Sequence, residues 1–234
     1  MNDLVIVHSW PESAHLALDE LRSDRALTAI SVAAADTTIR RGAKEHIRAA
    51  LRAMLGALLH RPAASISLVS HPGRPLLANL PGRHIRLSVS YAAGYVVAAI
   101  SLRCAVGIDV MRVEEAADAM PDWENVAQDY LGMQACARIA RLAPEQRSQA
   151  FAQEWTRFEA GLKCHGLALT EWCPRLEHLL ASCSLLPLAL PKKMTGAIAR
   201  LDCRVASTFY RGGGHGFGRT GASPCHFGAG TEPL

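Results

Sequence analysis

Residues 104–115 read CAVGIDVMRVEE and place a carboxylate inside an apolar segment. The residues from Ala105 to Val110 are apolar except for Asp109, and such a run with one glycine is typical of a short buried strand. A charge in a buried strand is costly unless it is paired or binds a metal ion. We therefore expect Asp109 to have a partner elsewhere in the chain.

Length and composition leave the number of domains open. The chain has 234 residues, enough for one large domain or two small ones, and its apolar content of 50% is sufficient for a core. It has no uninterrupted apolar run of about 20 residues, so we expect no membrane-spanning helix. The first residues, MNDLVIVHSWPE, do not resemble a signal peptide, which predicts a cytoplasmic location. The seven cysteines form no C-x-x-C pair, so we expect reduced thiols rather than a disulfide framework or a zinc site.

Hydrophobic periodicity predicts strands and helices along most of the chain. Besides the segment around Asp109, strands are expected over 4–10, 65–70, 84–91, 94–102 and 197–208, with a hairpin connection at 92–94. A helix is expected over 37–60, and a helix-rich stretch over 122–166. Residues 211–234 are rich in glycine and poor in core-forming residues, which predicts a flexible tail.

The helix predicted over 37–60 carries a basic stripe. Its basic residues recur at every fourth position and are Arg40, Lys44, Arg48 and Arg52. Such a stripe could meet phosphates or an acidic protein partner, or it could be a solvated face. The net charge of +4 is modest and no aromatic residues interleave the stripe, so nucleic-acid binding is not expected.

A second carboxylate lies in the helix predicted over 144–166, which Pro144 begins and Gly166 caps. A narrow apolar stripe along this helix consists of Phe151, Trp155, Phe158 and Leu162. Glu159 falls at the edge of that stripe, and Lys163 lies one turn further on, nearer to solvent. The helix therefore presents a carboxylate and an amine at the rim of the core.

Two interpretations of Glu159 and Lys163 are open at this point. One is an ordinary i,i+4 ion pair, worth a few tenths of a kcal/mol. In the other, Asp109 and Glu159 border the same core and converge on a hard cation such as Mg²⁺, which proteins bind through one or two carboxylates plus substrate phosphates and waters. Arg41, Lys44 and a turn at Arg74 lie upstream and would suit a polyphosphate. The second interpretation points to phosphoryl-group chemistry.

Four short motifs, which follow one another along the chain in the order expected for the family, resemble the 4′-phosphopantetheinyl transferase superfamily. The resemblance is to its longer, pseudo-dimeric, surfactin-synthetase-activating type. VGIDV at 106–110 and EWTRFEAGLKCHGLAL at 154–169 are similar to the paired signature G-[IV]-D and W-x-x-K-E-[AS]-x-x-K. Upstream, HPGRPLL at 71–77 resembles the family's G-K-P turn, and LSVSY at 87–91 its N-[IVL]-S-H strand. The resemblance extends over about residues 38–170.

The resemblance implies a role for each matching residue. Asp109 and Glu159 would bind Mg²⁺, Glu159 would also help to deprotonate the acceptor serine, and Lys163 would meet the pyrophosphate of coenzyme A. The positions that match coenzyme A-binding residues are Arg41, Gly73, Arg74, Pro75, Ser90, Tyr91 and Lys163. The implied reaction is attack of a serine of an apo acyl or peptidyl carrier protein on the β-phosphate. It releases adenosine 3′,5′-bisphosphate and leaves a phosphopantetheine arm on the carrier.

The sequence departs from the family pattern at several of these positions. Tyr91 replaces the usual histidine and Ser88 the usual asparagine, so coenzyme A would be held with less positive charge. Phe158 replaces the lysine before the motif glutamate, and its place on the apolar stripe predicts packing instead of substrate contact. Met111 stands where many members have a third acidic ligand. A thioether is a poor Mg²⁺ ligand, so a water is expected in its place. Because some members of the family also lack this acid, the resemblance still implies an active enzyme.

The resemblance also implies an α+β fold of two similar α/β subdomains, related by a pseudo-twofold axis with the active site between them. The expected bounds are 1–104 for the first subdomain and 105–210 for the second, which carries the metal and catalytic motifs. A monomer is expected. The alternative function is a degenerate relative that binds coenzyme A or a carrier protein without catalysis. Tyr91, Phe158 and the unusual tail at 211–234 motivate this alternative, whereas the intact acidic pair and Lys163 favour catalysis.

Overall fold

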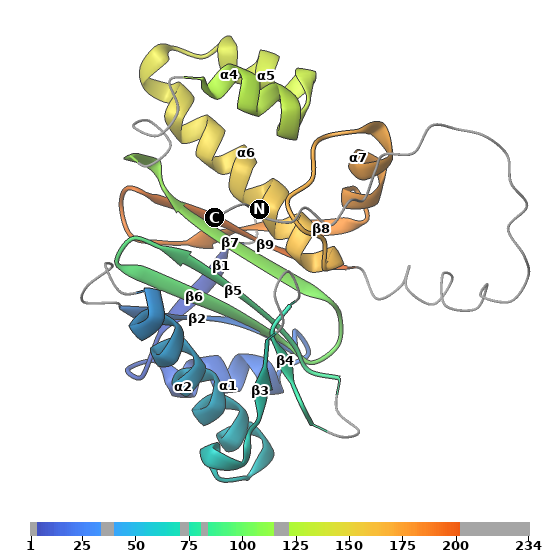
Figure 1. Cartoon of the computed structure of the whole chain (residues 1–234). Helices are drawn as coiled ribbons and strands as arrows, with labels where there is room; N and C mark the ends of the chain where they lie inside the picture. Colours follow the sequence, from blue (N-terminus) through green and yellow to red (C-terminus); the bar gives the residue numbers. More distant parts are fainter. Residues whose placement is uncertain (1–3, 34–39, 71–74, 81–83, 115–121, 202–234) are drawn as a thin grey trace, which may run out of the picture.

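The computed structural model describes residues 4–33, 40–70, 75–80, 84–114 and 122–201. Within these ranges the chain forms a mixed α/β fold with six α-helices and one nine-stranded sheet (Figure 1). The strands are β1 (Val5–Ser9), β2 (Leu27–Ala33), β3 (Leu68–Val69), β4 (Leu77–Ala78), β5 (Arg86–Ala92), β6 (Tyr95–Ser101), β7 (Val106–Arg112), β8 (Cys183–Ala189) and β9 (Met194–Leu201). The α-helices are α1 (Ala14–Arg22), α2 (Arg40–Leu59), α4 (Trp123–Val126), α5 (Met133–Ala140), α6 (Pro144–His165) and α7 (Pro174–Leu180). None of the described helices has the length and apolar character needed to cross a membrane.

The N-terminal strand β1 joins two parts of the sheet, one formed by β3, β4, β5, β6 and β2 and the other by β8, β9 and β7. The strand order is β3-β4-β5-β6-β2-β1-β8-β9-β7. Strand β1 pairs in parallel with β2, where Val7 lies opposite Ala29, and with β8, where Val5 lies opposite Leu188. The other neighbouring strands pair antiparallel. One sheet therefore includes strands from both the first and the last described segments of the chain.

The sheet buries apolar residues on both faces because side chains alternate along each strand. On β6, Ala98 packs in a core with α1 and α2, while its neighbours Val97 and Ala99 belong to a second core. The buried members of that second core all come from strands, and they include Ile108 of β7 and Ile198 of β9. Figure 1 shows α1 and α2 on one side of the molecule and α6 on the other. The two parts of the sheet thus face each other across the second core.

Two serine side chains of β5 pair with the edge of β7 that faces away from β9. The amide of Ile108 donates to Ser88 Oγ at 3.1 Å, and the amide of Val110 donates to Ser90 Oγ at 3.3 Å. Both serines are buried, so these bonds satisfy backbone amides that water does not reach. Strands β5 and β7 are therefore held side by side although they are not neighbours in the strand order.

Helix α6 lies directly on β7, and Gly107 makes this contact possible. A Cβ atom at Gly107 would lie 1.9 Å from the carbonyl oxygen of Ala160 and 2.4 Å from the amide nitrogen of Cys164. No side chain fits in that space, so the glycine allows the strand backbone to touch the helix backbone. Asp109 lies two residues further along the same face of β7 and is directed toward the same helix.

Most of the predicted elements are confirmed, with some changes in their bounds. Helix α6 begins with Pro144 and is capped by Gly166 in the left-handed conformation (φ 67°), as predicted. The predicted strand at 65–70 was too long, because residues 63–65 form a 3₁₀ turn and only Leu68–Val69 pairs. The predicted strand at 197–208 begins earlier, at Met194.

The helices α1 and α7 and the strands β2, β4 and β8 were not predicted, although Pro174 at the start of α7 is the same helix-start signal as Pro144 in α6. The proposed division into subdomains 1–104 and 105–210 and the pseudo-twofold axis remain predictions. The predicted flexible tail at 211–234 lies outside the described residues.

Replacing Gly107 by alanine should destabilise the protein, because the added methyl group collides with helix backbone rather than with a movable side chain. We expect a loss of at least about 3 kcal/mol in the free energy of unfolding, at the upper end of the usual cost of overpacking. Urea denaturation measures this change. In α2, an added Cβ at Gly42 would meet nothing within 4 Å, so Gly42→Ala is the matched control. It should stabilise the helix by up to about 1 kcal/mol, and equal losses in both variants would contradict this interpretation.

Candidate functional site

Four polar side chains from β5, β7 and α6 meet where these elements pack together. Lys163 Nζ lies 2.6 Å from Asp109 Oδ1 and 3.3 Å from Glu159 Oε2. The hydroxyl of Ser90 donates to Asp109 Oδ1 at 2.7 Å and lies 3.5 Å from Lys163 Nζ. The partner expected for Asp109 is therefore Lys163 directly, and Glu159 joins the same cluster through that ammonium group.

Burial dominates the electrostatics of Asp109. Only 5% of the residue is exposed, and this desolvation raises the pKa of its carboxyl group from the ordinary value of 3.8 to about 6. The ammonium of Lys163 acts in the opposite direction, and the negative charge of Glu159 adds to the increase. A neighbouring cation is therefore required to stabilise the ionised form of this buried carboxyl group. The hydrogen bond from Ser90 fixes the orientation of the group.

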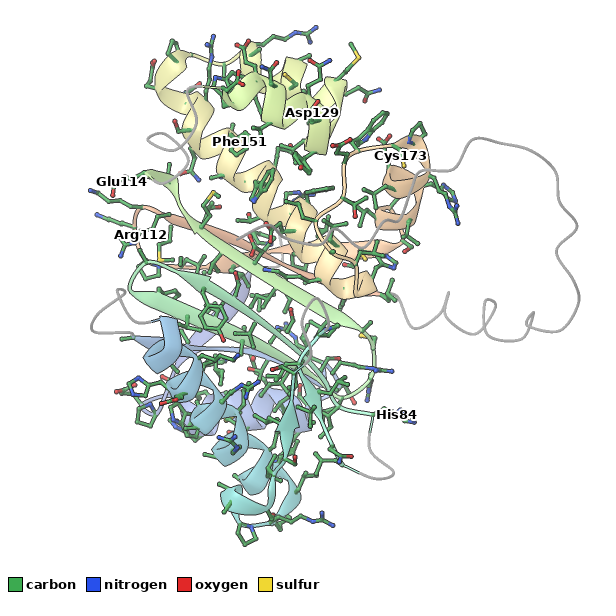
Figure 2. All side chains as sticks on the ribbon, in the orientation of Figure 1. His84, Arg112, Glu114, Asp129, Phe151 and Cys173 are labelled. Atoms are coloured by element: carbon green, nitrogen blue, oxygen red, sulfur yellow. The ribbon has the colours of Figure 1, made fainter. Side chains whose placement is uncertain are left out.

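The second carboxylate is positioned by aromatic packing. Trp155 Nε1 donates to Glu159 Oε1 at 3.2 Å, one turn earlier on α6. The indole ring contacts Phe151 and Tyr130, with ring centroids 5.7 Å apart in each case. Figure 2 shows Phe151 on α6 at the side that faces α4 and α5. The tryptophan of the signature therefore belongs to a packed cluster and holds one oxygen of Glu159, while the other oxygen faces Lys163.

A cavity of about 660 Å³ borders this cluster, a volume typical of small-molecule sites. On one wall, α6 contributes Glu159 and Lys163; on the other wall, α2 contributes Lys44 and Arg48. The side chain of Arg48 also donates to the hydroxyl of Ser70 at 2.6 Å, which directs the guanidinium toward the start of the loop after β3. From the described part of the chain, the cavity thus presents three cationic side chains and one carboxylate to a ligand.

Three of the predicted coenzyme A-binding residues line this cavity: Pro75, Tyr91 and Lys163. Ser90 does not belong to the lining, because its side chain points toward Asp109 and the edge of β7. Ser88, which replaces the family's asparagine, lines the cavity and also pairs with β7. Of these two serines at alternate positions of β5, Ser88 therefore lies at the cavity and Ser90 contacts the carboxylate cluster.

The remaining predicted residues lie outside what the structure describes. Gly73 and Arg74 fall in the gap at 71–74, and Arg41 belongs to the first turn of α2 without a described side chain. Arg48 was not selected from the sequence, although the basic stripe indicated it. The four-residue spacing did not show which members of the stripe face a cavity.

The other two departures from the family pattern have a packing explanation. Met111 packs against the apolar cluster of α4, α5 and α6 that contains Phe151. Phe158 is 7% exposed and packs with Leu162 and Leu176, which confirms its predicted packing role. Both substitutions therefore exchange a polar group of the family pattern for an apolar contact in this chain.

The donor set of the cluster fits a hard divalent cation. The carboxylates of Asp109 and Glu159 both reach one ammonium nitrogen, so they face a common point. Mg²⁺ commonly takes one or two protein carboxylates and completes its shell with phosphate oxygens and waters. Among the described residues no group of three or more His, Cys, Asp or Glu side chains is arranged to hold a metal ion. A metal here would therefore depend on the substrate and on water for its other ligands.

Comparison with known proteins agrees with the resemblance for the two motifs at 106–110 and 154–169; the motifs at 71–77 and 87–91 lie outside the match, and the longer, pseudo-dimeric type remains a prediction. Residues 105–187 match the family model of the 4′-phosphopantetheinyl transferase superfamily. The matched segment runs from the start of β7 into β8 and contains Asp109, Glu159 and Lys163. No curated protein matches the chain. The match supports a transferase of the phosphopantetheinyl type and, in general terms, phosphopantetheine transfer.

The raised pKa of Asp109 predicts that its contribution to stability is lost as the pH increases. Between about pH 4 and 6 the native carboxyl group keeps a proton that the unfolded chain has released, so the contribution is greatest below this window and is lost above it. The variant Asp109→Asn does not titrate. Relative to this variant, the wild-type free energy of unfolding should fall by about 1–3 kcal/mol from pH 4 to 7. Urea denaturation in the presence of a chelator measures the difference, and a constant difference would contradict the assignment.

Proposed function

We propose that this protein transfers the 4′-phosphopantetheine group from coenzyme A to a serine of an apo acyl or peptidyl carrier protein in a Mg²⁺-dependent reaction. The observation that carries the proposal is the Asp109–Lys163–Glu159 cluster at the wall of a cavity with cationic side chains on its opposite side. The cluster lies in the segment that matches the superfamily. The products would be the modified carrier protein and adenosine 3′,5′-bisphosphate.

Glu159 is the proposed base for the acceptor serine. Its side chain is 27% exposed, so a hydroxyl group or a bridging water can reach it from the cavity. Trp155 holds one carboxylate oxygen at 3.2 Å and thereby limits rotation of the group. A base must be within hydrogen-bond reach of the proton that it removes, and a fixed carboxylate at the cavity wall meets this condition.

Lys163 is the proposed contact for the pyrophosphate. Its ammonium reaches both carboxylates and lines the cavity, so it can neutralise negative charge on the enzyme or on the substrate. Bound by Asp109 and Glu159, Mg²⁺ would screen the pyrophosphate charge and stabilise the leaving group. Ser90 would keep the carboxylate of Asp109 oriented through its hydrogen bond at 2.7 Å.

Lys44 and Arg48 are proposed to bind the phosphates at the nucleotide end of coenzyme A. Both lie on α2 at the cavity wall opposite α6, and an arginine fork suits phosphate oxygens. The phenol ring of Tyr91 lines the cavity between the two helices, where the family's histidine would stand. Its hydroxyl can donate to a phosphate but supplies no charge, so the α2 cations would carry more of the electrostatic attraction.

The alternative function is binding of coenzyme A or a carrier protein without catalysis. Tyr91, Phe158 and the tail at 211–234 motivate it; Phe158 has a packing role in this chain, and the tail lies outside the described residues. A single experiment separates the two functions: the protein is incubated with coenzyme A, Mg²⁺ and a set of apo carrier proteins, and mass spectrometry detects the phosphopantetheine adduct. Binding of coenzyme A without an adduct on any carrier would favour the alternative. The monomeric state and the cytoplasmic location also remain predictions.

Removal of the proposed base should abolish transfer without unfolding the protein. We expect Glu159→Gln to lower the transfer rate at least about 100-fold, the usual lower range for loss of a general base. The matched control is Glu154→Gln on the same helix, since Glu154 is paired with Arg138 at 3.2 Å and does not line the cavity. The control should keep nearly the wild-type rate. Transfer by Glu159→Gln at the control's rate would disprove the assigned role.

The proposed phosphate contact on α2 should affect binding rather than chemistry. We expect Arg48→Ala to raise the KM for coenzyme A about tenfold with little change in kcat, because a charged hydrogen bond made in both ground and transition states is lost. Arg52→Ala is the control from the same stripe, as Arg52 lies one turn further along α2 and does not line the cavity. Steady-state kinetics with one apo carrier measures both constants. A similar KM in the two variants would exclude the assignment of Arg48.

A further inference from the structure

A cluster of thiols lies at the C-terminal end of α6, outside the cavity described above. Cys164 is in the last turn of α6 and Cys183 is the first residue of β8. Both belong to one small apolar cluster between α6 and β9, and they are close enough for each thiol to affect the pKa of the other. Cys164 is 5% exposed, whereas Cys183 is partly exposed. One thiol of the pair is therefore accessible and the other is protected behind it.

An imidazole and a hydroxyl group accompany the accessible thiol. His165 Nε2 lies 3.4 Å from Cys183 Sγ and 3.4 Å from Ser182 Oγ. On the other side, the thiol of Cys164 can donate to the carbonyl oxygen of Ala105 at 3.4 Å. A nearby imidazole that donates its N–H stabilises a thiolate more than a thiol. The geometry therefore favours the reactive form of Cys183.

The titration behaviour agrees with this geometry. The hydrogen bond from Cys164 lowers the pKa of the Cys183 thiol below its ordinary value, burial opposes this effect, and His165 adds to the decrease. A different environment surrounds Cys136 on α5, where burial raises the pKa of the thiol. Thiolates are the nucleophilic form of cysteine, so the two partly exposed thiols should differ in reactivity.

We infer that Cys183 and Cys164 form a peroxide-sensitive thiol pair that closes reversibly to a disulfide. The thiolate of Cys183 attacks a hydroperoxide, which breaks the O–O bond, gives a sulfenic acid and releases the reduced oxygen as water or alcohol. The sulfur of Cys164 then attacks the sulfenic sulfur, forms the S–S bond and releases water. The two thiols together lose two electrons and two protons, and the hydroperoxide accepts them.

The position of the pair gives the disulfide a structural consequence. Cys164 directly follows Lys163, and the turn that contains both residues rests on β7 at Gly107. A bond to Cys183 would link this turn covalently to β8, which is paired with both β1 and β9. Dithiol pairs of this kind in reducing compartments are usually transient and redox-sensing rather than structural.

The pair can be tested on the full-length wild-type protein without any substitution. Trypsin releases Cys164 within residues 164–175 and Cys183 within residues 176–192, so a disulfide appears as one joined peptide mass. Substoichiometric hydrogen peroxide should produce this joined peptide, and dithiothreitol should reverse it. Before oxidation, iodoacetamide should alkylate Cys183 at least about tenfold faster than Cys136. Equal alkylation rates, or a peroxide-treated Cys183 with no joined peptide, would overturn the inference.

Variants identify the second thiol. Cys164→Ser should leave Cys183 as a sulfenic acid that a 1,3-dicarbonyl probe traps, and Cys183→Ser should leave Cys164 reduced. Cys173→Ser separates the two cysteines that share residues 164–175, and Cys136→Ser is the control; both should still form the joined peptide. A disulfide from Cys183 to Cys104, Cys173 or any other cysteine would overturn the assignment of Cys164. Circular dichroism of each variant before oxidation verifies that it is folded.

Discussion

The direct contact between the backbones of β7 and α6 is the constraint on which the rest of the site depends. Because Gly107 has no side chain, the helix rests on the strand at Ala160 and Cys164. This close approach brings the next residue on the same face, Asp109, within 2.6 Å of the Lys163 ammonium. A larger separation would leave a buried carboxylate without a cation, which is one of the most costly arrangements in a protein interior. The ion pair of the motif aspartate therefore depends on the close packing that the motif glycine allows.

The site elements could be predicted largely because each carries a local signal. The apolar run around Asp109, the proline at the start of α6 and the apolar stripe beside Glu159 are all visible in the sequence, and each reflects a rule of local geometry. The pairing of Ser88 and Ser90 with the edge of β7 has no such signal. It depends on how two strands from different parts of the sheet approach each other, and an alternating strand pattern does not contain that information. The same limit applies to Arg48, because only the tertiary fold selects one face of the basic stripe.

Two departures from the family pattern replace a charged group by an apolar side chain that packs around α6. Met111 and Phe158 each extend an apolar cluster around α6, and this packing surrounds the tryptophan that holds Glu159. The acidic pair and the lysine are unchanged at the centre, while the neighbouring positions have become apolar. Such a site surrounds its carboxylates with apolar packing, and a cation bound there would take its further ligands from outside the chain.

The central position of β1 has a consequence for how the chain reaches its native state. Val5 pairs with Leu188, so one edge of the first strand finds its partner only in nearly the last described segment of the sequence. During synthesis on the ribosome β1 can pair with β2 early, but its other edge has unpaired amides and carbonyls until β8 has emerged. An unpaired apolar edge is prone to intermolecular association, and long-range pairing slows folding. Recombinant production of this protein should therefore benefit from slow translation or from chaperones that cover exposed strands.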